Sequence, residues 1–341
     1  MVKSTYMITE AIGYDIVRPR FLLFQKLQVN IMWELLLDLL WLVVGFVLLV
    51  KGADWFVDGS AGIAARMGIP QLIIGLTIVA MGTSAPEAAV SISAAFKGSA
   101  DITIGNIIGS NILNVLIILG LASVIVPIAI AKSTIRIEAP FMIAITGLLL
   151  VLGLDGKIAL VDGIILLVAF VSYLTYLFIC AKKNPTEEEE GDKKPIWKLL
   201  ILIVVGLASI VLGSNLAVDG ATGIAQVLGL SERFIGLTIV ALGTSLPELF
   251  TSVSAARKGN ADIAIGNIVG SNIFNILFVV GVSSVIIPVP FAAGFIVDTA
   301  VSIAAGVLLI ACCLSKKKLT RVGGIIMLVS YAAYFVYLLL K

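Results

Sequence analysis

The sequence predicts an all-α polytopic membrane protein with ten transmembrane helices, arranged as two inverted repeats of five helices. Its 341 residues are 60% hydrophobic and 13% charged, whereas about a quarter of the residues of a typical soluble domain are charged. Apolar runs of about 18 residues or more recur along the chain, as helices that cross a bilayer require. The second half also repeats the first at a constant offset of 161 residues.

Residues 1–31 differ from the rest of the chain, because they are polar and mixed and their longest apolar piece is FLLF. They lack the order of a signal peptide, in which a basic patch precedes an apolar stretch and a cleavage site. We predict a disordered or interfacial extension. Ten apolar runs come after it, and the helices expected from them cover 34–57, 69–97, 102–127, 137–154, 158–181, 196–224, 230–257, 263–288, 292–314 and 320–340.

One long polar segment, KKNPTEEEEGDKKP at 182–195, interrupts these runs. Its four glutamates fit a solvated linker better than a regulatory cation site, and it is too short to fold alone. It divides the chain into a first repeat at 32–181 and a second at 196–341.

The two halves are a duplication. Residues 82–114 align without a gap to 243–275, and 23 of 33 positions are identical, including polar ones. Five spans, an odd number, separate each residue from its copy, so the two copies cross the membrane in opposite directions. Many secondary transporters are built from such inverted repeats, with the substrate site near the midplane.

Lysine and arginine predict the orientation. The loops on the side of the termini hold 8 of the 23 basic residues, and the opposite loops hold 15; without residues 1–31 the split is 4 against 15. Because cytoplasmic loops carry the excess of positive charge, we expect both termini to be extracellular and the 182–195 loop to be cytoplasmic.

A carboxylate lies near the middle of one span in each half. Residues 80–90 read AMGTSAPEAAV and residues 241–251 read ALGTSLPELFT, which places Glu87 and Glu248 at equivalent positions. A charged side chain at the bilayer centre costs about 2.5–3.5 kcal/mol on insertion scales. No lysine or arginine lies at that depth nearby, so we expect a bound cation to neutralise the pair.

The neighbours of each glutamate are oxygen donors, as a sodium or calcium site requires. In a regular helix Thr83 and Ser84 would share a face with Glu87. Pro86 leaves the carbonyl of Gly82 without its hydrogen bond, which predicts a kink and free carbonyls around Ala80. The same reasoning applies to Ala241, Thr244, Ser245 and Glu248 in the second half.

The next span supplies a second wall through GNIIGSNILN at 105–114 and GNIVGSNIFN at 266–275. These sequences place Ser110 and Asn114, and likewise Ser271 and Asn275, one helical turn apart. Polar contacts between helices are the alternative role for these residues. The GxxxG pairs are typical of close helix packing.

Other features exclude several function classes. A net charge of +2 does not indicate nucleic-acid binding, and there is no histidine for a proton relay or a soft-metal site. The three cysteines, Cys180, Cys312 and Cys313, lack metal-ligand spacing. No nucleophile–base pair or cofactor motif predicts an enzyme. For Glu87 and Glu248 the remaining alternative is a pair of protonated, purely structural carboxyls.

The motifs GTSAPE…GNIIGSNILN and GTSLPE…GNIVGSNIFN closely resemble the α-repeats of the cation/calcium antiporter superfamily, in its sodium/calcium exchanger branch. This resemblance covers residues 34–341 and implies ten helices in two inverted halves. Helices 2, 3, 7 and 8 would surround the ions, and helices 1 and 6 would slide across that core.

The resemblance also implies the roles of individual residues. Glu87 and Glu248 would be ligands shared by Ca²⁺ and Na⁺, and Thr83 and Thr244 would bind Ca²⁺ together with the carbonyls of Ala80 and Ala241. The flanking sodium sites would use Ser84, Ser110, Ser245 and Ser271, and Asn114 and Asn275 would line the middle. Some members, including potassium-dependent ones, carry Asp at the position of Asn275, so the amide argues against potassium co-transport.

These observations predict a secondary-active antiporter that exchanges Na⁺ for Ca²⁺ by alternating access in the cell membrane. It would need no cofactor and would function as a single chain. A proton/calcium antiporter on the same scaffold is the main alternative, although that branch typically has Gly-Asn before its glutamate. A cation channel and a non-transporting scaffold are the further alternatives.

Overall fold

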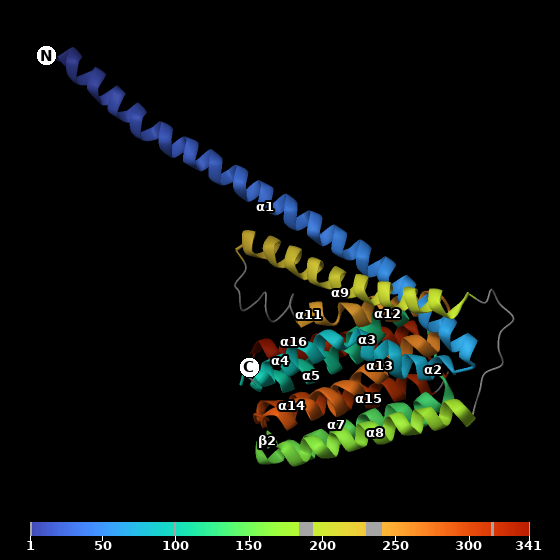
Figure 1. Ribbon diagram of the computed structural model, residues 1–341. Coiled ribbons are helices and arrows are strands. Elements are labelled where there is room, and N and C mark those ends of the chain that lie inside the picture. Colours follow the sequence, from blue (N-terminus) through green and yellow to red (C-terminus); the bar gives the residue numbers. More distant parts are fainter. Residues whose placement is uncertain (1, 99, 184–193, 230–240, 315–316, 341) are drawn as a thin grey trace.

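The computed structural model describes residues 2–98, 100–183, 194–229, 241–314 and 317–340, and these are almost entirely helical (Figure 1). In the first half, η1, η2 and η3 are π-helical and η4 is a 3₁₀ turn. The elements of this half are α1 (Val2–Met67), α2 (Gln71–Ile74), η1 (Gly75–Val79), α3 (Ala80–Thr83), α4 (Ala85–Phe96), α5 (Asp101–Leu113), η2 (Asn114–Leu119), α6 (Gly120–Ile125), β1 (Ile128–Ala129), η3 (Thr134–Glu138), α7 (Ala139–Leu152), η4 (Gly153–Asp155), β2 (Lys157–Ile158) and α8 (Leu160–Lys183).

The second half repeats this order, with a π-helical segment η6 at the position equivalent to η2. Its described elements are α9 (Ile196–Val227), α11 (Ala241–Thr244), α12 (Leu246–Arg257), α13 (Ala261–Phe274), η6 (Asn275–Val280), α14 (Gly281–Ile286), β3 (Val289–Pro290), α15 (Gly294–Leu314), β4 (Lys318–Leu319) and α16 (Arg321–Leu340).

The described residues include eight helices long and apolar enough to cross a membrane, and one bent pair, Gln71–Thr83 with Ala85–Phe96, that can form a ninth span. The predicted all-α polytopic membrane fold is therefore confirmed. The predicted span 230–257 lies partly outside the described residues, which contain only its α11 and α12 portion. The total of ten helices therefore stays a prediction.

Two spans form the centre of the bundle. In the most apolar window of Ala261–Ile286, 94% of the residues are buried, and in that of Thr103–Ile125 78% are, whereas the other long spans reach at most 39%. These outer helices, among them α1, α8, α9 and α16, carry many exposed leucine, valine and isoleucine side chains. Such a surface is suited to lipid, and it surrounds a core that contains the polar repeat motifs.

The packing of α1 against α9 establishes that the repeats are inverted. These helices are equivalent in the duplication, and they lie side by side along one flank of the bundle (Figure 1). A Cβ atom added at Gly45 would lie 2.7 Å from the carbonyl oxygen of Gly213, and one added at Gly206 would lie 2.8 Å from that of Gly52. The contacts run in opposite chain directions, so α1 and α9 are antiparallel.

Two short strand pairs join the halves with the same symmetry. β1 pairs with β4, where Ile128 lies opposite Leu319, and β2 pairs with β3, where Ile158 lies opposite Val289. An offset of 161 converts one pair into the other. Each pair is antiparallel and contains one strand from each half, so the two repeats are connected reciprocally.

The first helix is longer than the predicted span. Residues 2–31 continue α1 as a helix that projects beyond the other helices (Figure 1), so no break in helical structure marks residue 32. Whether this extension lies at a membrane interface stays a prediction, as does the division of the chain at residues 32, 182 and 196. Residues 184–193 of the predicted linker lie outside the described residues.

Candidate functional site

Each glutamate comes directly after a break in its helix. α3 and α4 meet at Ser84 with a bend of 51°, and α11 and α12 meet at Ser245, whose φ of −91° and ψ of 1° resemble the −82° and 7° of Ser84. Pro86 lies in the first turn of α4, where a missing N–H costs least. The predicted kink is thus confirmed.

The two carboxylates lie close together in the interior. Glu87 is 1% exposed and Glu248 is 0% exposed, and they are near enough to interact electrostatically. The Ser84 hydroxyl donates a hydrogen bond of 2.8 Å to Oε1 of Glu248, and Thr83 also lies beside this carboxylate. In the opposite direction, Thr244 and Ser245 lie beside Glu87.

This arrangement differs from the expected grouping of Thr83 and Ser84 with Glu87 on one helical face. The helix breaks at Ser84, so the regular spacing does not continue across the bend. Hydroxyls of each half therefore lie beside the carboxylate of the other half, and Ser84 hydrogen-bonds it. Neither repeat builds a complete site alone.

A second layer of the site consists of residues that were not predicted from the sequence. Asn106 donates hydrogen bonds to Ser91 Oγ at 2.9 Å and to the Glu87 carbonyl at 3.4 Å. Asn267 makes the same contacts to Ser252 and to the Glu248 carbonyl, at the same distances. These bonds fix the backbone of each glutamate against the neighbouring helix. These residues could have been found in the sequence, because each is the same residue type in both copies of the repeat.

Four asparagines join α5 and α13 at the centre. The Asn111 amide donates to the Asn272 carbonyl at 3.2 Å, and the Asn272 amide donates to the Asn111 carbonyl at 3.1 Å. Asn114 donates to Asn272 Oδ1 at 3.0 Å, and Asn275 donates to Asn111 Oδ1 at 3.1 Å. An offset of 161 residues converts each of these hydrogen bonds into the other bond of its pair. The axis that relates the two inverted halves therefore passes through this cluster.

Asn114 and Asn275, the two asparagines predicted to line the site, use their amide nitrogens as donors within this cluster. Their Oδ1 atoms accept no hydrogen bond from the described residues and can bind another partner. Each of these asparagines begins a π-helical segment, η2 or η6. Widened turns of this kind occur frequently at functional sites.

Several buried oxygen atoms around the glutamates have no hydrogen-bond partner in the described part of the chain. Buried polar atoms are nearly always hydrogen-bonded, so such a group indicates a bound partner or a functional role. They are Oε2 of Glu87, Oε2 of Glu248, Oδ1 of Asn114 and Oδ1 of Asn275, together with the hydroxyl of Ser245. All are hard oxygen donors, the ligand type preferred by Na⁺ and Ca²⁺.

The remaining predicted ligands lie on α3, α5, α11 and α13. The Ala80 carbonyl accepts hydrogen bonds from Thr83 at 3.3 Å and from Ser271 at 3.4 Å, so it faces the second half. Ser110 is buried on α5, and Ala241 begins α11. Among the described residues, no three histidine, cysteine or acidic side chains cluster, so the site combines two carboxylates with neutral oxygen atoms.

The family of sodium/calcium exchanger proteins matches the chain twice, over residues 37–179 and 198–340. The chain belongs to this family. The second match begins and ends 161 residues after the first, as the duplication requires.

Individual members of the family are similar along nearly their whole length. The chain is 42% identical over 312 residues to the putative antiporter CaxA of Alkalimonas amylolytica, covering 88% of this chain and 98% of the relative. It is 31% identical over 349 aligned positions to the sodium/calcium exchanger MaX1 of Methanosarcina acetivorans, covering 87% and 97%. A solved structure of the sodium-calcium exchanger NCX_Mj, soaked with 10 mM Na⁺ and 10 mM Sr²⁺, superimposes with a TM-score of 0.78 at 34% identity, covering 89% of this chain and 98% of that one.

These findings establish the general activity. The protein is a multi-pass membrane transporter of the cation/calcium antiporter superfamily, in the sodium/calcium exchanger branch, and its relatives are exchangers and not enzymes. The family transports ions and requires no cofactor.

Proposed function

We propose that the chain exchanges Na⁺ for Ca²⁺ across the membrane by alternating access, and that Glu87 and Glu248 bind either ion at one shared site. The observation that carries this proposal is the pair of buried carboxylates, one from each inverted half, whose Oε2 atoms have no hydrogen-bond partner among the described residues. Neither carboxylate forms an ion pair with a described lysine or arginine. A cation would supply the missing positive charge.

The other predicted ligands fit the same role. Thr83 and Thr244, with the carbonyls of Ala80 and Ala241, would contribute to calcium binding. Ser84, Ser110, Ser245 and Ser271 would complete flanking sodium sites, and Asn114 and Asn275 would offer their free Oδ1 atoms to the centre. Oxygen ligands at similar distances suit both ions, so Na⁺ and Ca²⁺ would compete for the two carboxylates.

Competition at one site couples the two fluxes. An empty site would carry two unpaired charges through the low-dielectric interior, which is costly, whereas a loaded site is neutralised. Only loaded forms would then change the side to which they open. We further propose that the chain functions as a single unit, with extracellular termini and a cytoplasmic 182–195 loop.

Uptake of calcium-45 into proteoliposomes, driven by an outward sodium gradient, tests this function. We expect Glu87→Gln to lower the initial rate about tenfold or more, because loss of a charged ligand weakens binding by more than about 1.4 kcal/mol. Glu138→Gln is the matched control, since Glu138 is also a buried membrane carboxyl, 4% exposed, but it is the last residue of η3 and precedes α7. Equal uptake in the wild type and in protein-free liposomes would refute the proposal.

A proton/calcium antiporter is the second candidate, because two carboxylates held this close together can also accept protons. Calcium uptake driven by a pH gradient in sodium-free buffer would favour it. Currents far above carrier turnover would instead indicate a channel.

A further inference from the structure

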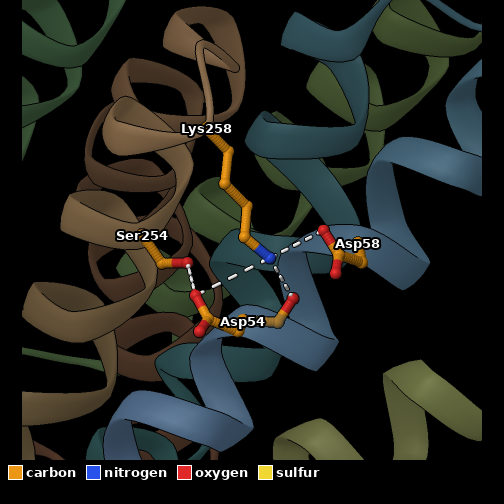
Figure 2. A network of polar contacts seen from close by, with 4 residues as sticks. All are labelled: Asp54, Asp58, Ser254 and Lys258. Atoms are coloured by element: carbon orange, nitrogen blue, oxygen red, sulfur yellow. Dashed lines mark hydrogen bonds and ion pairs between the residues drawn. The ribbon is translucent and has the colours of Figure 1, made fainter.

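A polar cluster joins α1 to the end of α12, about ten residues after Glu248. The Lys258 ammonium lies 2.7 Å from Asp58 Oδ1 and 3.6 Å from Asp54 Oδ1, and it donates a hydrogen bond of 2.8 Å to the Asp54 carbonyl (Figure 2). Ser254 donates a hydrogen bond of 2.7 Å to the same Asp54 carboxylate. Four residues from two helices of opposite halves thus form one network.

The duplication contains most of these residues a second time. An offset of 161 residues relates Lys258 to Lys97, Ser254 to Ser93 and Asp58 to Asp219, and it replaces Asp54 by Asn215. Lys97 and Asp219 are both described by the structure, both are exposed, and they form no ion pair with each other. The sequence therefore provides two such contacts, and this conformation has formed one.

The helix packing has the same asymmetry. α1 packs extensively against α12, whereas α9 and α4, the equivalent pair, barely touch. Because the spans alternate in direction, Lys258 and Lys97 lie at opposite ends of the bundle. The close backbone contacts at Gly45, Gly52, Gly206 and Gly213 hold α1 and α9 together as one unit. A shift of this unit that brings Asp219 to Lys97 would withdraw Asp58 from Lys258.

We infer that Lys258, Asp54 and Asp58 form a latch that holds α1 against α12 and closes one end of the ion pathway, and that Lys97 and Asp219 form the matching latch when the opposite end is closed. This inference rests on the alternating access proposed above. The first latch is the stronger one by composition, since it has two carboxylates where the second has one.

The latch is suited to reversible opening. The side chains of Lys258, Asp54 and Asp58 are 28%, 38% and 46% exposed, and a cavity of about 330 Å³ lies beside them, lined in part by Asp54, Arg257 and Lys258. Partly exposed ion pairs contribute little individually. Such a contact can bias an equilibrium between two conformations without trapping either.

Chemical cross-linking tests the exchange of latches. In a variant with its three native cysteines replaced, Lys97→Cys and Asp219→Cys are introduced together with a protease site in the 182–195 loop. A lysine–carboxylate contact separates its Cβ atoms more than a disulfide tolerates, so a short reducible bis-thiosulfonate reagent is used. Cross-linked halves then migrate together on a denaturing gel after proteolysis.

We expect this pair to cross-link in membranes supplied with both ions, although the two residues are apart in the present conformation. Adding Lys258→Gln should raise the initial cross-linking rate by about two- to fivefold, the range that a partly exposed ion pair allows. Arg257→Gln is the matched control, because Arg257 is the adjacent exposed cation and belongs to neither latch. It should leave the rate unchanged.

A second variant guards against misfolding. Asp58→Lys with Lys258→Asp restores one ion pair of reversed polarity, while Asp54 then faces a second carboxylate. This variant should therefore lower the cross-linking rate below that of Lys258→Gln, toward that of the unmodified latch. The inference is overturned if the cysteines of the Lys97→Cys and Asp219→Cys variant never cross-link in protein that transports calcium. It is also overturned if Lys258→Gln and Arg257→Gln change the cross-linking rate equally. Absence of sodium-driven uptake in the wild type would refute the proposed function alone, because cross-linking reports helix position whichever ions move.

Discussion

At the scale of single residues, the site depends on contacts that cross between the halves. Ser84 of the first half hydrogen-bonds Glu248 of the second, and Asn111 and Asn272 exchange amide–carbonyl bonds across the axis. Polar groups buried at this depth have no water to replace a lost partner, so each bond matters more than its equivalent on a surface. The central asparagines should therefore contribute to stability as well as to ion binding.

We expect Asn272→Leu to destabilise the protein. Its amide donates to the Asn111 carbonyl at 3.1 Å, and its Oδ1 accepts from Asn114 at 3.0 Å. Leucine leaves the Asn114 side-chain amide without this acceptor, at about 1–3 kcal/mol for a buried group, and removes one of the bonds to the Asn111 carbonyl, which keeps the backbone N–H of Asn114. The melting temperature measured by fluorescence-detected size exclusion should fall clearly below that of Ser330→Ala, which removes only an exposed bond to the Ile326 carbonyl. Equal melting temperatures would contradict this account.

At the scale of secondary-structure elements, the sequence predicted where a helix breaks, but not which residues the break brings together. Pro86 correctly indicated a break, but helical spacing placed Ser84 beside Glu87, and the structure brings it to Glu248. The π-helical turns that begin at Asn114 and Asn275 could not be predicted, because they lie in uniformly apolar runs that suit a regular α-helix equally well. Contacts between halves depend on docking, which local periodicity does not encode.

The α1–α9 pair provides a test of helix packing. A Cβ atom at Gly206 would lie 2.6 Å from the backbone nitrogen of Phe56, and a backbone neighbour cannot move aside as a flexible side chain can. We expect Gly206→Ala to lower the free energy of unfolding by about 1–3 kcal/mol, the usual cost of overpacking.

The control for this change is Gly147→Ala on α7, where an added Cβ meets nothing within 4 Å. Alanine is favoured over glycine within a helix by about 0.5–1 kcal/mol, so this variant should be neutral or slightly stabilised. Thermal unfolding of both variants in the same detergent compares them directly. A Gly206→Ala protein as stable as Gly147→Ala would show that α1 and α9 are not closely packed.

At the scale of the whole molecule, the duplication predicted most of the architecture. An odd number of spans between copies requires inversion, and the antiparallel contact of Gly45 with Gly213 agrees with it. The position of the glutamates at the interface of the halves could be predicted by the same argument. The conformation was not predicted. Lys97 and Lys258 occupy equivalent positions, but the counterpart of Asp54 is Asn215, and only Lys258 pairs with its aspartates among the described residues. This difference of one carboxylate favours the first latch, but it could be recognised only after the structure had shown that Lys258 contacts Asp54.

The reciprocal interface predicts that the covalent link between halves is dispensable once the protein has folded. The halves are held together by the α1–α9 packing, the asparagine cluster and two strand pairs, β1 with β4 and β2 with β3. We expect protein cleaved at a protease site inserted into the 182–195 loop to elute as one particle in detergent. It should also retain sodium-driven calcium uptake within about twofold, because nicks in such connecting segments are generally tolerated. The uncut protein is the reference for elution, and a heated sample of the cut protein shows where separate halves elute. Separation of the halves under native conditions would mean that the linker, and not the reciprocal interface, keeps the two carboxylates together.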